Sequence, residues 1–291
     1  MRQEQHLMAA TGLMLVVTVL SAFDTVIVRL LTADLHPFVI VFFRSVFGLA
    51  FVLPWIVSQR GILSSHYRLL HVVRAGLKML SLAAFFTAIA LVPLADVTAI
   101  AFTTPIFLTL GAWMCLGEKL LPRRILAVVI GFCGVLFILQ PSQSNWSTPL
   151  LFALAGAVLT AIIQLMLKVM SAHDSTQTLV AWNLVVTVPM AAIPLLWFWN
   201  APSHEQILLL VLQGAIGACN MAAMTRAMAL AQASYIAPLD FLRLPAVALL
   251  GYVFFAEIPG NATVIGAIVI FLSTLLLAEW STKSKKTNVK A

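Results

Sequence analysis

The feature that most constrains this chain is a succession of apolar runs, each long enough to cross a lipid bilayer. The hydrocarbon core of a bilayer is about 30 Å thick, so a helix that crosses it needs roughly 20 mainly apolar residues. Short breaks with proline or polar residues, such as His36-Pro37 and Pro141-Ser142, separate the runs. The pattern predicts an all-α, polytopic membrane protein with ten transmembrane helices, at 7–31, 36–57, 69–91, 95–116, 123–140, 147–170, 177–199, 206–229, 233–256 and 260–280.

Composition supports a membrane protein and argues against a nucleic-acid partner. Hydrophobic residues make up 62% of the chain and charged residues 9%, whereas a soluble domain carries roughly 25% charged residues. The net charge of +7 could indicate nucleic-acid binding. Because the basic residues lie in short loops and in the tail, we expect contact with the lipid bilayer and no nucleic acid.

The chain carries no motif that points to an enzyme. No P-loop GxxxxGK[ST] occurs, and the six histidines lack the spacing of a metal site. Cys115, Cys133 and Cys219 fall inside apolar segments, where cysteine usually serves as a small packing residue. We therefore expect no catalytic residue, no metal and no cofactor.

The distribution of lysine and arginine predicts the orientation in the membrane. With the N-terminus inside, the inner loops hold nearly all of these residues, and Arg29 is the main exception on the outer side. Both termini are therefore expected in the cytoplasm, with residues 283–291 as a basic cytoplasmic tail.

The chain also resembles itself at a spacing of 139 residues. This single ungapped shift aligns Leu91 with Leu230 and Glu118 with Glu257, together with the helix breaks between them. Residues 1–141 and 142–282 then form two halves of five helices each. An odd number of helices inverts the second half relative to the first, and inverted repeats are typical of secondary transporters with a binding site near the midplane.

The two halves resemble the EamA-type transporters of the drug/metabolite transporter superfamily, and the resemblance covers about residues 7 to 280. It rests on the residues that end the first and fourth helices of each half and on an arginine in the second helix. These residues are Gly117-Glu118, Ala256-Glu257, Arg29, Lys168 and Arg44.

The resemblance implies a fold of two EamA-like repeats around a central cavity that opens alternately to each side of the membrane. Such transporters export amino acids and other metabolites, or import compounds such as riboflavin and S-adenosylmethionine. It implies a transporter and not an enzyme.

Two charged residues lie in the middle of the predicted ninth helix, where ionisable groups are costly and usually face a protein interior or a watery cavity. Asp240 and Arg243 are three residues apart, so they share one helix face and can pair directly. Their counterparts in the first half are Ala101 and Thr104, which are uncharged. The pair binds the charged groups of a polar solute or gates the cavity, or alternatively it is an internal ion pair that fixes helix packing.

Asp24 lies on a polar stripe of the first helix with Thr18 and Ser21, about 10 Å from the outer end. It is a candidate for substrate or proton binding, with pairing to Arg29 or Arg44 as the alternative. Arg44 lies about 10 Å into the second helix and is predicted to be a structural partner of a carboxylate or a carbonyl.

Four more residues are candidate substrate contacts. Lys78 lies too far into the third helix to reach the headgroups easily, and Gln164 and Asn220 belong to polar stripes of the sixth and eighth helices. Trp182 could stack on an aromatic solute, although a tryptophan in such a helix more often only packs.

The sequence therefore predicts a secondary transporter of a small polar or zwitterionic solute in a bacterial inner membrane. An amino acid derivative, a vitamin or a nucleoside-like cofactor fits the mixed charge of the candidate residues. If protons drive transport, Asp24 or Asp240 would carry them, and the protein would act as a monomer or a homodimer. The alternative is a membrane scaffold without transport, in which the polar residues form satisfied pairs.

Overall fold

The computed structural model describes residues 2–58, 61–116, 122–139, 148–170, 173–230, 239 and 242–288. Every regular element in these residues is a helix, so the all-α prediction is confirmed. The helices are α1 (Arg2–Leu31), α2 (Pro37–Ser58), α3 (Arg68–Leu91), α4 (Leu94–Ala101), α5 (Thr104–Leu116), α6 (Pro122–Leu139), α7 (Thr148–Met170), α8 (Thr176–Ala192), α9 (Leu195–Phe198), α10 (His204–Leu230), α12 (Arg243–Phe255) and α13 (Asn261–Asn288).

Six apolar segments are long enough to cross a membrane, and four shorter apolar helices accompany them. The long segments are Met8–Leu31, Pro37–Ser58, Arg68–Leu91, Leu94–Cys115, Thr148–Leu167 and His204–Met224. The shorter ones are Val128–Ile138, Gln177–Ala192, Arg243–Phe255 and Asn261–Ser273. The chain is thus built to cross a membrane several times, while the number of ten crossings stays a prediction.

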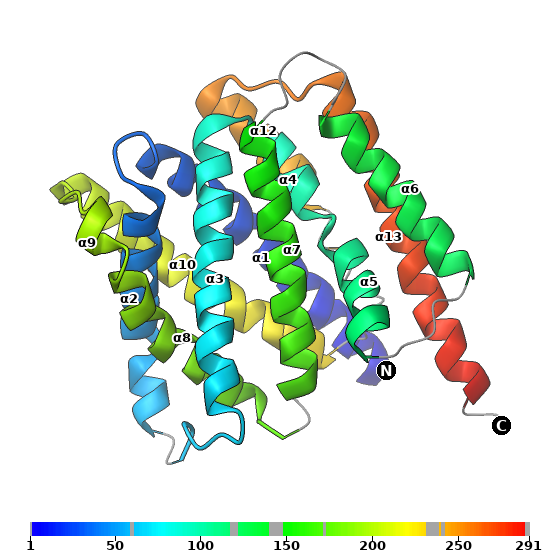
Figure 1. Ribbon diagram of the computed structural model, residues 1–291, viewed down its shortest axis with the longest axis horizontal. Coiled ribbons are helices and arrows are strands. Elements are labelled where there is room, and N and C mark those ends of the chain that lie inside the picture. Colours follow the sequence, from blue (N-terminus) through cyan, green and yellow to red (C-terminus); the bar gives the residue numbers. More distant parts are fainter. Residues whose placement is uncertain are drawn as a thin grey trace.

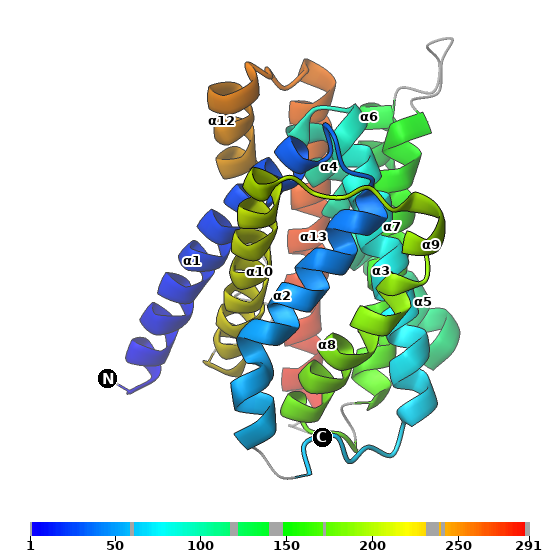
Figure 2. The ribbon, with the colours of Figure 1, turned by 90° about the vertical axis from the view of Figure 1, so that its left-hand side faces the viewer.

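The helices form one bundle (Figures 1 and 2), and many large apolar side chains are exposed on its surface. On α1, Leu15, Val16 and Val19 are exposed, whereas Met14 and Val17 are buried against the rest of the bundle. Exposed aliphatic side chains are stable in contact with lipid tails. The first residues of α1 and the last residues of α13 lie towards the same end of the bundle.

One predicted span, 95–116, is divided in the structure. α4 ends at Ala101 and α5 begins at Thr104, because Pro105 cannot donate a backbone hydrogen bond and its ring would clash with the carbonyl of Ala101. The Thr104 hydroxyl donates to that carbonyl at 2.8 Å, and Thr103 donates to the carbonyl of Ile100 at 2.7 Å. The break is therefore stabilised by local side chains.

The predicted span 177–199 is also divided, into α8 and α9, and Pro194 immediately precedes α9. The predicted span 233–256 corresponds to α12, which begins at Arg243. Residues 231–238 and 240–241 lie outside the described part of the chain.

Helix boundaries recur at the spacing found in the sequence. The starts of α2 and α8 are 139 residues apart, and so are the starts of α5 and α12. The packing recurs too, since α1 packs on α10 and α12 while α7 packs on α3 and α5. α6 lies beside α13, as Figure 1 shows.

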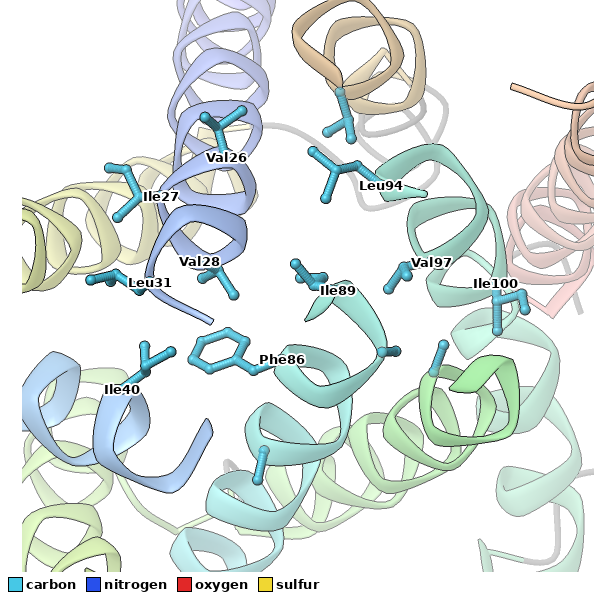
Figure 3. Packing of buried hydrophobic residues seen from close by; sticks show 14 of the residues in the cluster. Val26, Ile27, Val28, Leu31, Ile40, Phe86, Ile89, Leu94, Val97 and Ile100 are labelled. Carbon is cyan, nitrogen blue, oxygen red and sulfur yellow. The ribbon is translucent and has the colours of Figure 1, made fainter. Parts of the chain in front are cut away.

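The largest apolar core lies where the ends of α1 and α3 meet α4 and the start of α2 (Figure 3). Leu31, Ile40 and Ile100 are fully buried in it, and Phe86 points into its middle. This core fixes α1, α2 and α3 against one another, and the polar residues described next lie on these same three helices.

Candidate functional site

The centre of the candidate site is an ion pair between α1 and α2. Arg44 Nη1 lies 2.6 Å from Asp24 Oδ1 and 2.7 Å from Oδ2, and both side chains are mostly buried, with 18% and 16% exposed. Each residue is seven positions from the nearest end of its helix, or about 10 Å. The guanidinium also lies 5.9 Å from the ring centroid of Phe86 on α3, within the range of a cation–π contact.

Lys78 of α3 joins this pair from a third helix. Its charged neighbours are Asp24, Arg44 and Arg74, and its side chain is partly buried. Within the described part of the chain, no acceptor lies at hydrogen-bonding distance from the ammonium group. The pair and Lys78 therefore place two cations and one carboxylate together inside the bundle, and Lys78 keeps its hydrogen-bonding capacity. We refer to Asp24, Arg44 and Lys78 as the central cluster.

α10 closes one side of the central cluster. Asn220 Nδ2 donates to Ser21 Oγ of α1 at 2.8 Å. Gly217 lies against Arg44, and a Cβ atom at that position would come within 2.9 Å of Nη2. The Arg44 guanidinium thus lies against the surface of α10 at a residue that has no side chain. A larger residue at position 217 would displace the guanidinium, which explains why glycine occurs there.

Arg243 takes a different position from the other candidates. It is the first residue of α12, and its guanidinium carbon lies 4.9 Å from the ring centroid of Phe102, at the break between α4 and α5. Asp240 lies outside the described residues, so the Asp240–Arg243 pair stays a prediction. The broken helix of the first half and the start of α12 therefore meet through Phe102 and Arg243.

Within the described part of the chain, Gln164 and Trp182 make no hydrogen bond or ion pair with Asp24, Arg44 or Lys78. Gln164 is exposed on α7, one turn after Thr160, which hydrogen-bonds Ser81 of α3 at 2.9 Å. Trp182 of α8 donates to the carbonyl of Leu63 at 3.0 Å and stacks on His71, with ring centroids 5.0 Å apart. Of the predicted substrate contacts that the structure describes, Asp24, Lys78 and Asn220 are grouped around Arg44.

Sequence reasoning missed a polar cluster at the end of the bundle where α3 begins. Asp174, in the turn before α8, accepts hydrogen bonds from Ser65 Oγ at 2.5 Å and from the His66 backbone at 3.2 Å. His71 Nε2 lies 2.8 Å from the same carboxylate. We refer to Asp174, Ser65, His66 and His71 as the Asp174 cluster.

The hydrogen bonds of the Asp174 cluster lower the pKa of the Asp174 carboxyl. Burial alone would raise the pKa of Asp174, but the bonds from Ser65, His71 and the His66 backbone outweigh burial and hold that pKa below its ordinary value. Nearby, Arg74 donates to the carbonyl of Leu179. The contacts join residues about a hundred positions apart, so no local sequence pattern predicts them.

A second cluster lies at the opposite end of α3. Glu257 Oε1 lies 3.2 Å from Arg29 Nη2, and Oε2 accepts a hydrogen bond from the backbone of Leu94 at 2.8 Å. Arg29 also donates to the carbonyls of Ile89 and Val92. Glu257 thus caps the first turn of α4, where a negative charge is favourable. We refer to these contacts as the Glu257 cluster.

The Glu257 cluster depends on an unusual turn at the end of α12. Ala256 has a left-handed conformation with φ of 54°, which is uncommon for a residue other than glycine. Its backbone and that of Glu257 bond back to Tyr252 and Gly251, as in a helix C-terminal motif. The turn directs the Glu257 side chain towards α4 and Arg29.

A helical bundle with an apolar surface and a buried cluster of charges is typical of a multi-pass membrane protein, and comparisons with known proteins give its family. The EamA-like transporter family matches residues 8–140 and again residues 147–278. The chain therefore belongs to the EamA-like transporter family.

Individual relatives support this assignment. A riboflavin transporter from Vibrio cholerae serotype O1 is 31% identical over 218 residues, which cover 74% of this chain and 73% of that protein. An S-adenosylmethionine uptake transporter from Rickettsia prowazekii is 26% identical over 267 residues, or 91% of each chain. A solved crystal structure with 18% identity shares the fold, with a TM-score of 0.62 over 95% of this chain and 98% of the other. The protein is thus a metabolite transporter, and a non-transporting scaffold is not favoured.

Proposed function

We propose that this protein is a secondary transporter in which the central cluster and Asn220 bind a small polar or zwitterionic metabolite. The observation that carries the proposal is that Asp24 and Arg44 pair between two membrane-spanning helices, with Lys78 of a third such helix as a charged neighbour. Ionisable residues at this depth are costly unless they face a partner or a watery cavity, and in transporters they mark the substrate path. Vitamins and nucleoside-like cofactors such as riboflavin and S-adenosylmethionine fit this chemistry, and the relatives named for these two compounds support the choice.

Alternating access is supported by the recurrence of helices in the two halves. Helix boundaries and helix pairs recur at 139 residues, as expected if residues 1–141 and 142–282 are equivalent five-helix units. Because each unit has an odd number of crossings in the predicted topology, the second would be inverted. Rocking of such units about a site between them exposes the site to each side in turn.

The two end clusters would serve as gates. The Asp174 cluster and the Glu257 cluster lie at opposite ends of α3, and each joins a residue of the second half to the first half. His71 and Ile89 are 18 residues apart, which corresponds to about 27 Å along a helix. Opening the bundle at one end would break the cluster at that end while the other holds the halves together.

The remaining candidates would contact parts of the solute farther from Asp24. These candidates are Asp240, Arg243, Gln164 and Trp182. The protein would lie in a bacterial inner membrane with both termini in the cytoplasm, as a monomer or a homodimer. If protons drive transport, Asp24 or Asp240 would carry them.

The proposal is tested by uptake of labelled riboflavin and S-adenosylmethionine into proteoliposomes. Asp24→Asn and Lys78→Met should each lower uptake roughly tenfold or more, because loss of one member of a buried charge group removes interactions worth several kcal/mol. Asp34→Asn is the matched control, since Asp34 is exposed in the turn after α1. Undiminished uptake by both cluster variants would contradict the assignment of the site.

A further inference from the structure

A fully buried amide on α10 lacks hydrogen-bond partners. The Gln213 side chain has no exposed surface, and within the described residues neither Oε1 nor Nε2 has a partner. Burying an amide without hydrogen bonds is unfavourable, and buried polar groups in native proteins are nearly always satisfied. A group left unsatisfied in one state of a transporter is therefore a candidate for a bond formed in another state.

Gln213 lies between the face of α10 that packs on α2 and the face that packs on α1. The next residue, Gly214, meets α2, where a Cβ atom would come within 2.6 Å of Phe47 Cβ. Asn220, seven residues on, hydrogen-bonds Ser21 of α1. The Gln213 side chain thus leaves α10 towards the space between α1 and α2.

The central cluster lies on the same side of α10 as the Gln213 side chain. Gly217, which the Arg44 guanidinium crosses, is four residues after Gln213 on the same side of α10. Four residues of helix correspond to a rise of about 6 Å. Gln213 therefore lies about one helical turn along α10 from the point where Arg44 meets this helix, a separation that one small organic molecule can span.

We propose that Gln213 is a specificity-determining residue whose amide binds an uncharged edge of the solute. This inference rests on the transport function proposed above. The edge would carry an acceptor for Nε2 beside a donor for Oε1, as an amide, an imide or a ring carbonyl next to a ring N–H does.

The chemistry predicts a solute with two distinct ends. Its charged or strongly polar group binds Asp24, Arg44 and Lys78, and its uncharged hydrogen-bonding edge lies about one helical turn away. A solute without such an edge leaves the amide unpaired and is therefore bound more weakly, which gives discrimination between similar metabolites. Asn220 already donates to Ser21, so Gln213 supplies the free amide on this face.

The first arm of the test needs no ligand. Methionine nearly matches glutamine in shape, so Gln213→Met replaces an unsatisfied amide by an apolar group of similar size. The thermal midpoint of the purified, ligand-free variant should equal or exceed that of the wild type. A fall of about 4 °C or more would overturn the proposal, because it would mean that the amide stabilises the protein without any solute. Gln177→Met, at an exposed position of α8, is the matched control.

The second arm measures transport of riboflavin, which carries an imide edge, in proteoliposomes. Gln213→Met should raise KM roughly tenfold and leave the maximal rate within about twofold, as expected for loss of hydrogen bonds to the bound solute. An unchanged KM would overturn the proposal, and Gln177→Met should behave as the wild type. If the wild-type protein carries neither riboflavin nor S-adenosylmethionine, the choice of solute in the proposed function fails, and the thermal midpoint still decides whether the Gln213 amide is unsatisfied.

Discussion

At the scale of single residues, the candidate solute site is built on the ion pair between Asp24 and Arg44. Both oxygens of the carboxylate lie within 2.7 Å of one guanidinium nitrogen, and less than a fifth of either side chain is exposed. Removing one member therefore leaves a charge whose burial is not compensated.

Arg44→Ala should destabilise the protein by about 3 kcal/mol, the order found when a buried ion pair loses one partner. Urea unfolding of the detergent-solubilised protein measures the change. The double variant Asp24→Asn/Arg44→Met should recover part of the loss, because it leaves no unpaired charge. Equal destabilisation by the single and the double variant would contradict the pair as a coupled unit.

Asp174 should make stability depend on pH in a defined window. Its carboxyl has a pKa below the ordinary value, so the folded protein holds this proton less tightly than the unfolded chain does. The stabilisation is complete above the unfolded pKa of about 3.9 and is lost as the pH falls below it. The thermal midpoints of the wild type and Asp174→Asn should therefore differ at pH 6, and the difference should shrink as the pH falls below about 3.9.

Other carboxyls also titrate between pH 6 and pH 3, so the informative quantity is the difference between two proteins. Asp34→Asn, which changes an exposed residue, controls for removal of one charge. A difference between the wild type and Asp174→Asn that stays constant from pH 6 to pH 3 would show that the Asp174 carboxylate does not stabilise the fold.

At this scale the sequence predicts only part of the site. Asp24, Arg44 and Lys78 stand out because a charge within an apolar run has few explanations. The Asp174 cluster gives no such signal, since Asp174 and Ser65 lie in loops that are polar in any membrane protein. Their partnership depends on how the halves pack, which a single sequence does not specify.

At the scale of elements, glycine permits the closest helix crossing near the site. α2 and α10 approach at Gly48 and Gly214, and a Cβ atom on Gly214 would come within 2.9 Å of the Gly48 backbone nitrogen. Small residues allow helices to pack closely in a membrane. This approach holds α10 near enough to α2 for Arg44 to reach Gly217.

Gly214→Ala should lower stability by about 1–3 kcal/mol, because the added methyl group meets backbone that cannot move without separating the helices. The matched control is Gly12→Ala on α1, where a Cβ atom has no neighbour within 4 Å. That change should be neutral or stabilising, since alanine favours a helix more than glycine does. Thermal midpoints of the two variants test the expectation, and a fall in both would contradict the crossing as its cause.

Helix boundaries illustrate what the sequence can and cannot predict at this scale. The predicted spans 36–57 and 69–91 agree with α2 and α3 within one residue at each end, because proline and polar residues mark their limits. Pro105 lies at the break between α4 and α5, but the apolar run of the sequence continues across this break. Hydropathy alone therefore predicts one helix where proline geometry gives two.

At the scale of the whole molecule, the same 139-residue spacing is found in the sequence and in the structure. It aligns the two halves of the sequence in one register, and it also separates the starts of α2 and α8 and the starts of α5 and α12. The sequence could predict the spacing because each half carries the same breaks. It could not predict that Arg29 pairs with Glu257 and Asp174 with His71, since these contacts cross between the halves.

The central claim is that the residues around Arg44 form a solute site reached from each side of the membrane in turn. The direct test places a single cysteine at Leu82→Cys, a partly buried position one helical turn after Lys78 on α3, in a protein whose Cys115, Cys133 and Cys219 are replaced by alanine. Membrane-impermeant thiol reagents are then added to one side or the other of sealed vesicles. Modification is expected from both sides, at rates that a bound solute lowers. Modification from neither side, or from one side only whatever the solute, would contradict it.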